Sequence, residues 1–570
     1  MDAKVDKDLL LEREKCTFDI QELIHIIDGG KEKTLMRKNV ENLVLSIKEL
    51  KDEVPEDYLS HAEKYENAVR KGCILFDIYF QLTKNNTTKL DQSPSNVYRI
   101  HEGILKQVNP FLLHYGLFMP TIMSQATEEQ QTKWLKKNSK MIGTYAQTEL
   151  GHGSFLRGLE TTATFDPETD EFILNSPAIT SYKFWPGGLG HTANASVLMA
   201  QLYIKEKCLG THLFLVQIRD FETHKPLPGI KVGEIGPKMG FNTANNGFLG
   251  LDNVRIPREN MLMKNAQVLR DGTYIKSKND KLTYGSMVMV RVHIISDIAY
   301  ELARAVTIAV RYSAVRHQSL LKEGNPEPQV LDYVTQQHKL FISIASSHAF
   351  RVVGKWMWKT YTKVIAQIGE GNLNQLPELH ALTCCLKAVC TRDGLAMVES
   401  CRLACGGHGY LLSSNLPNLY SIVAASVTYE GEHTVVLLQT ARSNNFKENT
   451  YKGFYVEFPD SETSDLEIVS TQVINPSIKR SASPFAGLDE LFDVHKNKKR
   501  KLSSSISRVQ NSGDTAFVSI NADDGQNASH LIKIELYDLK KISEIPSNEY
   551  WKNTKTRTKL NRKKKNFEHI

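Results

Sequence analysis

The sequence contains no long uninterrupted hydrophobic run. None of its apolar stretches approaches the roughly 18 to 20 uncharged residues that a membrane-spanning helix needs. The N-terminus has neither a basic start followed by an apolar run nor an amphipathic start rich in arginine and serine. We therefore expect a protein that is not integral to a membrane and that is not directed by a cleaved secretory or mitochondrial presequence.

Cysteine is scarce and follows no ligand pattern. The chain has eight cysteines, including the adjacent Cys384 and Cys385, but none forms a CxxC pair or alternates with histidine at metal-ligand spacing. Reduced thiols in an intracellular protein without a metal site are the expectation. HExxH, GxSxG and P-loop motifs are also missing, which weakens metalloprotease, esterase and NTPase interpretations.

Excess charge is small as well. The net charge is +7 over 570 residues, and much of the basicity falls in two runs, residues 496–501 and 562–565. The rest of the chain is close to neutral, so we expect it to have no nucleic-acid partner. The run at 496–501 fits either a nuclear or nucleic-acid patch or a solvated loop.

Hydrophobic periodicity predicts a mainly α protein with a central β-domain. Helical spacing dominates residues 1–140, short β-branched runs between Gly, Pro and Asn fill 141–275, and long helical patterns return over 276–442. One of these helices is expected over 330–368, interrupted at Gly354, and another over 376–405. Residues 443–570 have weak periodicity and are expected to form an atypical tail, partly disordered, with strand-like alternation at 516–520 and 531–537.

Two glycine-containing turns follow β-like segments. The first contains Thr148 and the sequence Gly151-His152-Gly153-Ser154, and the second is Trp185-Pro186-Gly187-Gly188. Open glycine turns let a backbone approach a flat or phosphorylated ligand, while hydroxyls can both donate and accept hydrogen bonds. Spacing alone favours tight turns without a ligand. Neither turn matches GxGxxG at a strand-to-helix junction, so a Rossmann site is not indicated.

Two further segments lie at helix ends. Gly406-Gly407-His408-Gly409 follows a long helix, and capping explains one or two of its glycines but not the third. Glu430 and Glu432 flank Gly431 at the expected start of a short helix. On spacing alone, both carboxylates are best explained as charges that complement the positive helix terminus.

Taken in order, these four segments resemble the acyl-CoA dehydrogenase/oxidase superfamily, and specifically the peroxisomal acyl-CoA oxidases of the straight-chain type. The resemblance covers roughly residues 12 to 442. Further segments that look like this family are Phe18–Gly29, Thr180–Gly190, Thr223–Gly240, Asn253–Met263, Arg311–Gln318 and Leu376–Leu382.

The resemblance implies an N-terminal helical domain, a β-barrel-like domain and a helical bundle, with FAD between the last two. By this resemblance, Thr148 would form a hydrogen bond with the flavin, and Gly187 would let the backbone come close to the flavin. Arg316 and Gly407 would contact the FAD of a partner subunit, which implies a homodimer. Glu430, not Glu432, would be the base that removes a proton from acyl-CoA, with O2 as the electron acceptor and trans-2-enoyl-CoA and H2O2 as products.

The resemblance stops near Arg442. The sequence beyond it does not look like the family's second C-terminal helical domain, and the final Glu568-His569-Ile570 does not match a Ser-Lys-Leu-like peroxisomal signal. A splicing or gene-model artefact, an isoform imported by pairing with a signal-bearing paralogue, and a fusion with another module all remain open. An acyl-CoA dehydrogenase using another acceptor, and a weakly active or inactive acyl-CoA-binding subunit, are the alternative functions.

Overall fold

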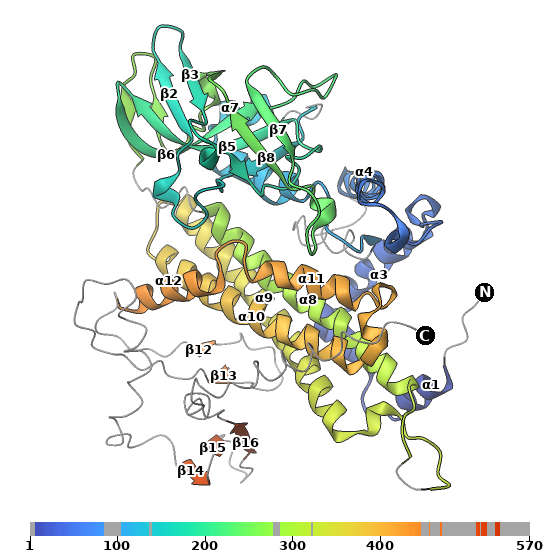
Figure 1. Cartoon of the computed structure of the whole chain (residues 1–570). Coiled ribbons are helices and arrows are strands. Elements are labelled where there is room, and N and C mark those ends of the chain that lie inside the picture. The colour runs from blue at the N-terminus through green and yellow to red at the C-terminus, as the bar shows by residue number, and fades with distance from the viewer. Residues whose placement is uncertain are drawn as a thin grey trace, which may run out of the picture. The chain divides into compact units, whose positions relative to one another are not determined.

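The computed structural model describes residues 6–84, 104–135, 140–277, 285–320 and 323–445, together with short strands between 455 and 535. The chain divides into two units, residues 1–450 and 451–570. In the first unit, helices are followed by strands and then by further helices (Figure 1). This succession confirms the mainly α fold class with a central β-domain, whereas the exact domain boundaries remain predictions.

The N-terminal part is helical because local capping agrees with the apolar spacing. Its helices are α1 (Lys7–Glu14), α2 (Ile20–Asp28), α3 (Lys31–Ser46), α4 (His61–Lys84), α6 (Met119–Gln125) and α7 (Glu128–Trp134). The Asp19 side chain caps α2 by accepting hydrogen bonds from the backbone N–H groups of Gln21 and Glu22, and Gly29 ends this helix with a φ of 89°. Directly before α6, residues His114–Phe118 form a π-helical turn, a rare conformation that is frequent at functional sites.

The central part forms two small sheets and a short strand pair. Its strands are β1 (Gly143–Ala146), β2 (Thr162–Asp166), β3 (Glu171–Asn175), β4 (Lys183–Phe184), β5 (Ala195–Ile204), β6 (Lys207–Gln217), β7 (Ile230–Glu234), β8 (Gly247–Leu251), β9 (Val254–Pro257), β10 (Gln267–Val268) and β11 (Tyr274–Ile275). The larger, curled sheet has the order β1-β5-β2-β3-β9 with β6 also paired to β5, and the smaller sheet has the order β4-β8-β7. Strand β5 is buried along almost all of its length because it pairs with β1 and β2 on one edge and with β6 on the other.

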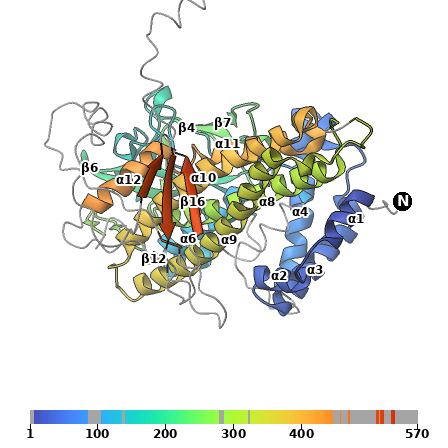
Figure 2. The ribbon, with the colours of Figure 1, turned by 90° about the horizontal axis from the view of Figure 1, so that it is seen from below.

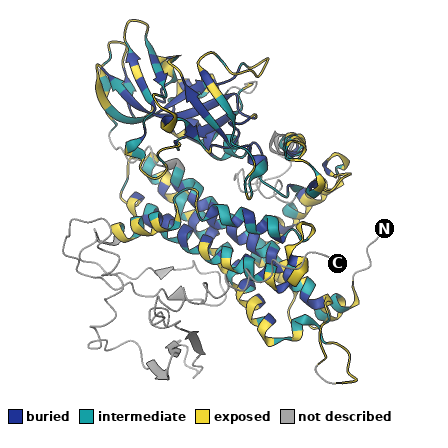
Figure 3. Ribbon diagram, viewed as in Figure 1, coloured by how far each residue is buried: buried dark blue, intermediate teal, exposed yellow. Residues whose placement is uncertain are grey.

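The described residues from 285 to 445 contain five α-helices: α8 (Gly285–Val315), α9 (Val334–Gly369), α10 (Leu376–Ala404), α11 (Leu416–Ser426) and α12 (His433–Asn445). Helices α8 and α9 lie side by side in both views (Figures 1 and 2). The facing sides of these helices are buried and their outer sides are exposed (Figure 3). Helix α11 was not predicted from the sequence. Among the described helices, none is both long and apolar enough for a bilayer crossing.

Glycines set the close approach of α9 and α10 to α8. A Cβ atom on Gly354 of α9 would lie 2.6 Å from the Ser296 Oγ of α8, and a Cβ on Gly394 of α10 would overlap the Ile298 side chain of α8. The expectation that Gly354 interrupts its helix is therefore wrong, because α9 runs through this position without a break. The missing side chain serves helix packing, and tertiary contacts outweigh the weak helix propensity of glycine.

The second unit contains short antiparallel strands. Strand β12 (Tyr455–Val456) pairs with β13 (Ile468–Val469), and β14 (Val509–Ser512), β15 (Thr515–Ile520) and β16 (His530–Glu535) form a three-stranded sheet. The strands predicted near 516–520 and 531–537 are thus present. The other expectations for residues 446–570 lie outside the described residues.

The packing of α9 on α8 gives a testable prediction. We expect Gly354→Val to lower the midpoint of thermal unfolding by several degrees, because overpacking a core costs about 1–3 kcal/mol. Gly369→Ala is the matched control, since a Cβ at the end of α9 meets nothing within 4 Å. Equal midpoints for the two variants, measured by circular dichroism, would contradict this account of the interface.

Candidate active site

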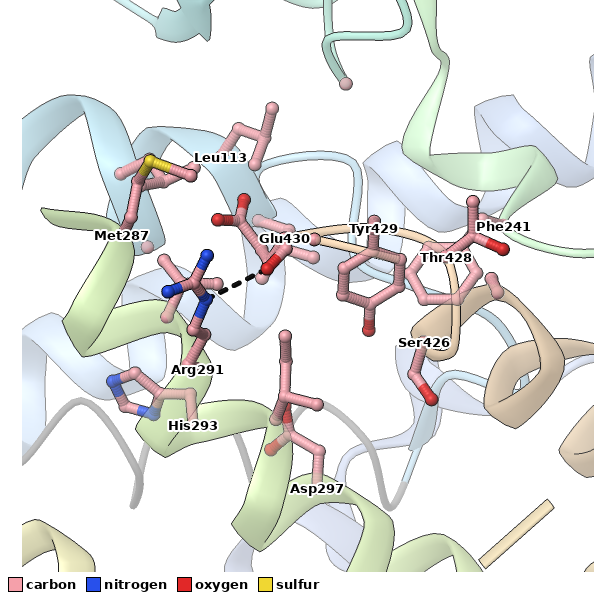
Figure 4. A pocket seen from close by; sticks show the side chains of 18 of the residues that line it. Leu113, Phe241, Met287, Arg291, His293, Asp297, Ser426, Thr428, Tyr429 and Glu430 are labelled. Atoms are coloured by element: carbon pink, nitrogen blue, oxygen red, sulfur yellow. Dashed lines mark hydrogen bonds between the residues drawn. The ribbon is translucent and has the colours of Figure 1, made fainter. Parts of the chain in front are cut away.

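A cavity of about 1770 Å³ lies between the N-terminal part, the central strands and the long helices. This volume exceeds the roughly 300–1,000 Å³ of a typical site for one small molecule. Its wall includes Thr148 and Gly187 from the central part. It also includes Arg291 from α8 and Glu430 from the loop between α11 and α12 (Figure 4). The structure thus brings together three of the predicted site residues, Thr148, Gly187 and Glu430.

Glu430 occupies an unusual backbone position. Its φ is 56° and that of Gly431 is 100°, so two consecutive residues are left-handed. A Cβ on Gly431 would lie 2.5 Å from Val436 Cγ1, which explains why a glycine follows the glutamate. A left-handed conformation costs a glutamate about 1–2 kcal/mol, and such outliers cluster at functional sites.

Two buried cations hold the backbone around Glu430. The Arg291 Nε donates a hydrogen bond to the Glu430 carbonyl oxygen at 2.9 Å, drawn as the dashed line in Figure 4. The Lys387 Nζ, from α10, donates to the carbonyl oxygens of Gly431 at 2.6 Å and Val427 at 3.3 Å. The loop is therefore fixed on both sides of the glutamate from two different helices.

The electrostatic environment of Glu430 combines opposing effects. Burial raises the pKa of its carboxyl group above the usual value, while the positive charges of Arg291 and Lys387 act in the opposite direction. Burial and the neighbouring charge of Arg291 also lower the pKa of Lys387 to about 8. Since a carboxylate with a raised pKa binds a proton more strongly than an exposed one, this arrangement suits proton abstraction.

The second glutamate of the motif has a different environment. Glu432 is exposed, and its carboxylate accepts hydrogen bonds from the backbone N–H groups of Thr434 at 2.9 Å and Val435 at 3.3 Å. These contacts cap the start of α12. The sequence spacing had predicted such a role at the helix terminus for both glutamates. Glu432 thus fulfils it. Both glutamates line the cavity, but no hydrogen bond among the described residues engages the carboxylate of Glu430.

A buried ion pair anchors the loop that presents Thr148. Lys183 Nζ lies 2.8 Å from Glu149 Oε1, both side chains are fully buried, and the same ammonium donates to the Gln147 carbonyl at 3.1 Å. The Thr148 carbonyl accepts a hydrogen bond from the Phe184 N–H at 2.9 Å. The residues on both sides of Thr148 are therefore held in place, and so is its own backbone.

The second turn adds aromatic and polar groups to the cavity wall. Trp185 has a φ of 87° and a half-exposed ring. The Gly187 carbonyl accepts from Thr144 Oγ1 at 2.6 Å, and a Cβ on Gly187 would lie only 3.1 Å from the Ala244 carbonyl oxygen. In the described chain, the buried Asn246 Oδ1 has no hydrogen-bond partner. An unsatisfied acceptor on a cavity wall marks a place where a ligand can donate.

Arg316 and Gly407 lie elsewhere. Both are exposed and line a smaller cavity of about 540 Å³ at the C-terminal ends of α8 and α10, and neither lines the larger cavity. Arg316 Nη2 donates to Gln318 Oε1 at 2.9 Å. The third glycine of the segment, Gly409, has a packing role, because a Cβ there would overlap the Arg402 carbonyl oxygen.

Four residues of the site were not predicted from the sequence: Arg291, Lys387, Lys183 and Asn246. A usable signal existed for the first two, because each is a lone charge within an apolar helical stretch, MVMVRVHII and TCCLKAVC. A cation that is buried needs partners nearby. Which partner each one meets depends on long-range packing, and periodicity does not report that.

Comparisons with known proteins agree with this architecture. The family described as "Acyl-coenzyme A oxidase N-terminal" matches residues 19–142, and the acyl-CoA oxidase C-alpha1 domain matches residues 284–444. Acyl-coenzyme A oxidase 1 of Drosophila melanogaster is 51% identical over 446 residues, which are 78% of this chain and 67% of that protein. Peroxisomal acyl-coenzyme A oxidase 1 of Homo sapiens is 50% identical over 440 residues, 77% of this chain and 66% of that protein.

Solved structures give the same result. Acyl-CoA oxidase-2 of Caenorhabditis elegans, bound with FAD, ascaroside-CoA and ATP, superimposes with a TM-score of 0.74 at 42% identity, covering 78% of this chain and 66% of that one. For Arabidopsis thaliana acyl-CoA oxidase 1 the TM-score is 0.72 at 41% identity, with 78% and 67% of the two chains covered. The chain spans about two thirds of the length of these relatives. On sequence and on fold, the chain belongs to the acyl-CoA oxidase family.

Proposed function

We propose that this protein is an FAD-dependent oxidase that converts acyl-CoA to trans-2-enoyl-CoA and reduces O2 to H2O2, the first step of peroxisomal fatty acid β-oxidation. The observation that carries the proposal is the Glu430 carboxyl group, with its raised pKa, on the wall of a cavity large enough for two ligands. The peroxisome is the proposed compartment because curated relatives such as the human protein are named peroxisomal.

Glu430 would act as the base. The proton next to a thioester carbonyl is weakly acidic, so its removal needs both a positioned base and hydrogen bonds to the carbonyl oxygen. Glu430 alone could supply both the base and a hydrogen bond to the carbonyl oxygen. The carboxylate can take the proton, and the Glu430 backbone N–H has no hydrogen-bond acceptor within the described part of the chain, so it is available to the thioester oxygen.

The residues around Thr148 and Gly187 fit a flavin. The Thr148 hydroxyl can donate or accept, Asn246 Oδ1 is a buried acceptor without a donor, and the half-exposed Trp185 offers an aromatic face. Each of these groups matches a property of a flat ring that has both donors and acceptors. When bound, FAD would supply the acceptor for the two electrons that leave the substrate as hydride, and O2 would then take them to give H2O2.

The smaller cavity supports a homodimer. Arg316 is a cation beside the glycine segment around Gly407, a combination suited to a pyrophosphate group. Because this cavity is separate from the one containing Glu430, we propose that it holds part of the FAD bound by a partner subunit.

Removing the proposed base is the first test. We expect Glu430→Gln to lower the rate of H2O2 release from a long-chain acyl-CoA at least about 100-fold, because the amide keeps the shape but cannot accept the proton. FAD retention, read from the flavin absorbance, should not change. Glu432→Gln is the control and should keep its rate within a few-fold. A protein that takes up no FAD, or an E430Q variant as fast as the unchanged protein, would contradict the proposal.

The pH dependence tests the same group. Because only the ionised carboxylate can act as a base, kcat/KM should fall as the pH is lowered through the pKa of Glu430. Burial raises that pKa, so the midpoint should lie above the usual glutamate value of about 4.3. A kcat/KM that stays constant from neutral pH down to this value would count against Glu430 as the base.

Arg316 tests the role of the smaller cavity. We expect Arg316→Ala to weaken FAD binding roughly tenfold or more, since a hydrogen bond to a charged group contributes about 1.5–3 kcal/mol. Flavin fluorescence released on dilution measures this loss. The control is Arg311→Ala, because Arg311 is an exposed arginine of α8 that lines neither cavity. Identical FAD retention in the two variants would remove Arg316 from the cofactor site.

A further inference from the structure

Lys387 is a fully buried cation in the middle of α10. Its side chain has no exposed surface, and it lies beside a small apolar cluster formed by Cys384, Ala388 and Val436. Burying an ammonium group in such surroundings costs several kcal/mol unless other groups compensate it. The position therefore requires an explanation beyond packing.

The partners of Lys387 are unusual for a buried lysine. Its ammonium donates to two backbone carbonyls, those of Val427 and Gly431, and no ion pair found among the described residues includes it. Lys183, which is also fully buried, is in contact with the carboxylate of Glu149. Lys387 thus presents its charge to a loop without a direct ion-pair partner, and the two carbonyls that it binds bracket residues 428–430.

This loop needs external support. The left-handed backbone at Glu430 is strained, and neither α11 nor α12 includes these residues. Arg291 holds the Glu430 carbonyl from α8, so Lys387 supplies the second support from α10. Without it, the carbonyls of Val427 and Gly431 would lose a buried donor and the loop could relax toward ordinary φ values.

We propose that Lys387 is a positioning residue for Glu430, which fixes the loop so that the carboxylate and the backbone N–H of Glu430 both face the acyl-CoA thioester. This inference rests on the proposed function of Glu430 as the base. Lys387 touches neither substrate nor cofactor in this scheme and acts only through the loop.

Its charge adds a second effect on the same residue. The charged groups that act on the Glu430 carboxyl are Arg291 from α8 and Lys387 from α10, and both lower its pKa. Lys387 in turn lies in the field of Arg291, Glu432 and Cys384. Removing the lysine should therefore raise the pKa of Glu430 further, which a residue that only fills space would not do.

The experiment uses the FAD-loaded full chain with a long-chain acyl-CoA. We expect Lys387→Met to lower kcat about 10- to 100-fold, because small displacements of a catalytic group have effects of this size. KM should change less than about threefold, and the acidic limb of the kcat/KM profile should move to higher pH. Lys387→Gln keeps an N–H donor without the charge, so its kcat should lie between that of the unchanged protein and that of K387M. The acidic limb of its kcat/KM profile should move as in K387M.

Arg392→Met is the control, since it removes a charge from the exposed face of the same helix and should leave kcat and the pH profile unchanged. Unchanged kcat and pH profiles in K387M, or kcat and KM changing together without a shift of the acidic limb, would overturn the proposal. If K387M and K387Q both lose cooperative thermal unfolding, Lys387 supports the fold and the proposal is wrong.

A crystal structure of K387M separates this inference from the proposed function. We expect the φ of Glu430 to leave its present value of 56°. That readout does not depend on turnover. An inactive unchanged protein would refute the proposed function, whereas an active one with an unmoved Glu430 loop in K387M would refute the role of Lys387 alone.

Discussion

The site depends on one set of contacts, the hydrogen bonds from two buried cations to consecutive carbonyls of the loop between α11 and α12. Arg291 extends from α8 and Lys387 from α10, so both can reach this loop only if the two helices are closely spaced. Gly394 sets that spacing, since a side chain there would overlap Ile298 of α8. Close packing of α8 and α10 thereby lets both cations reach the loop that carries Glu430.

The part of the cavity wall formed by the central strands and turns has a similar arrangement. There Lys183 donates to the carbonyl of Gln147 and pairs with Glu149, which fixes the loop presenting Thr148. On both walls the residue that faces the cavity makes few contacts of its own, and a buried lysine orders the main chain beside it. Such support keeps a polar side chain in a defined position while its functional atoms remain available to a ligand.

The sequence predicted the order of helices and strands because the apolar period changes from 3.6 to 2 and back. It also drew attention to Glu430, but only resemblance separated that residue from Glu432. The separation has a physical basis that spacing does not contain: Glu432 caps α12, and Glu430 is turned into the cavity by a left-handed backbone. Lys387 escaped prediction because its partners lie about 40 residues away in the chain.

Glu149 and Glu430 show how contacts decide the chemistry of a carboxyl group. Burial acts to raise the pKa of both. Glu149 accepts hydrogen bonds from Lys183, from the hydroxyl and N–H of Thr161 and from the Glu160 N–H, and these contacts hold its pKa below the usual range. In the described chain no donor reaches the carboxylate of Glu430, which feels positive charge only at a distance, so burial prevails and its pKa is raised. A carboxylate whose lone pairs all accept hydrogen bonds has a structural role, whereas one whose lone pairs are free in a cavity can act as a base.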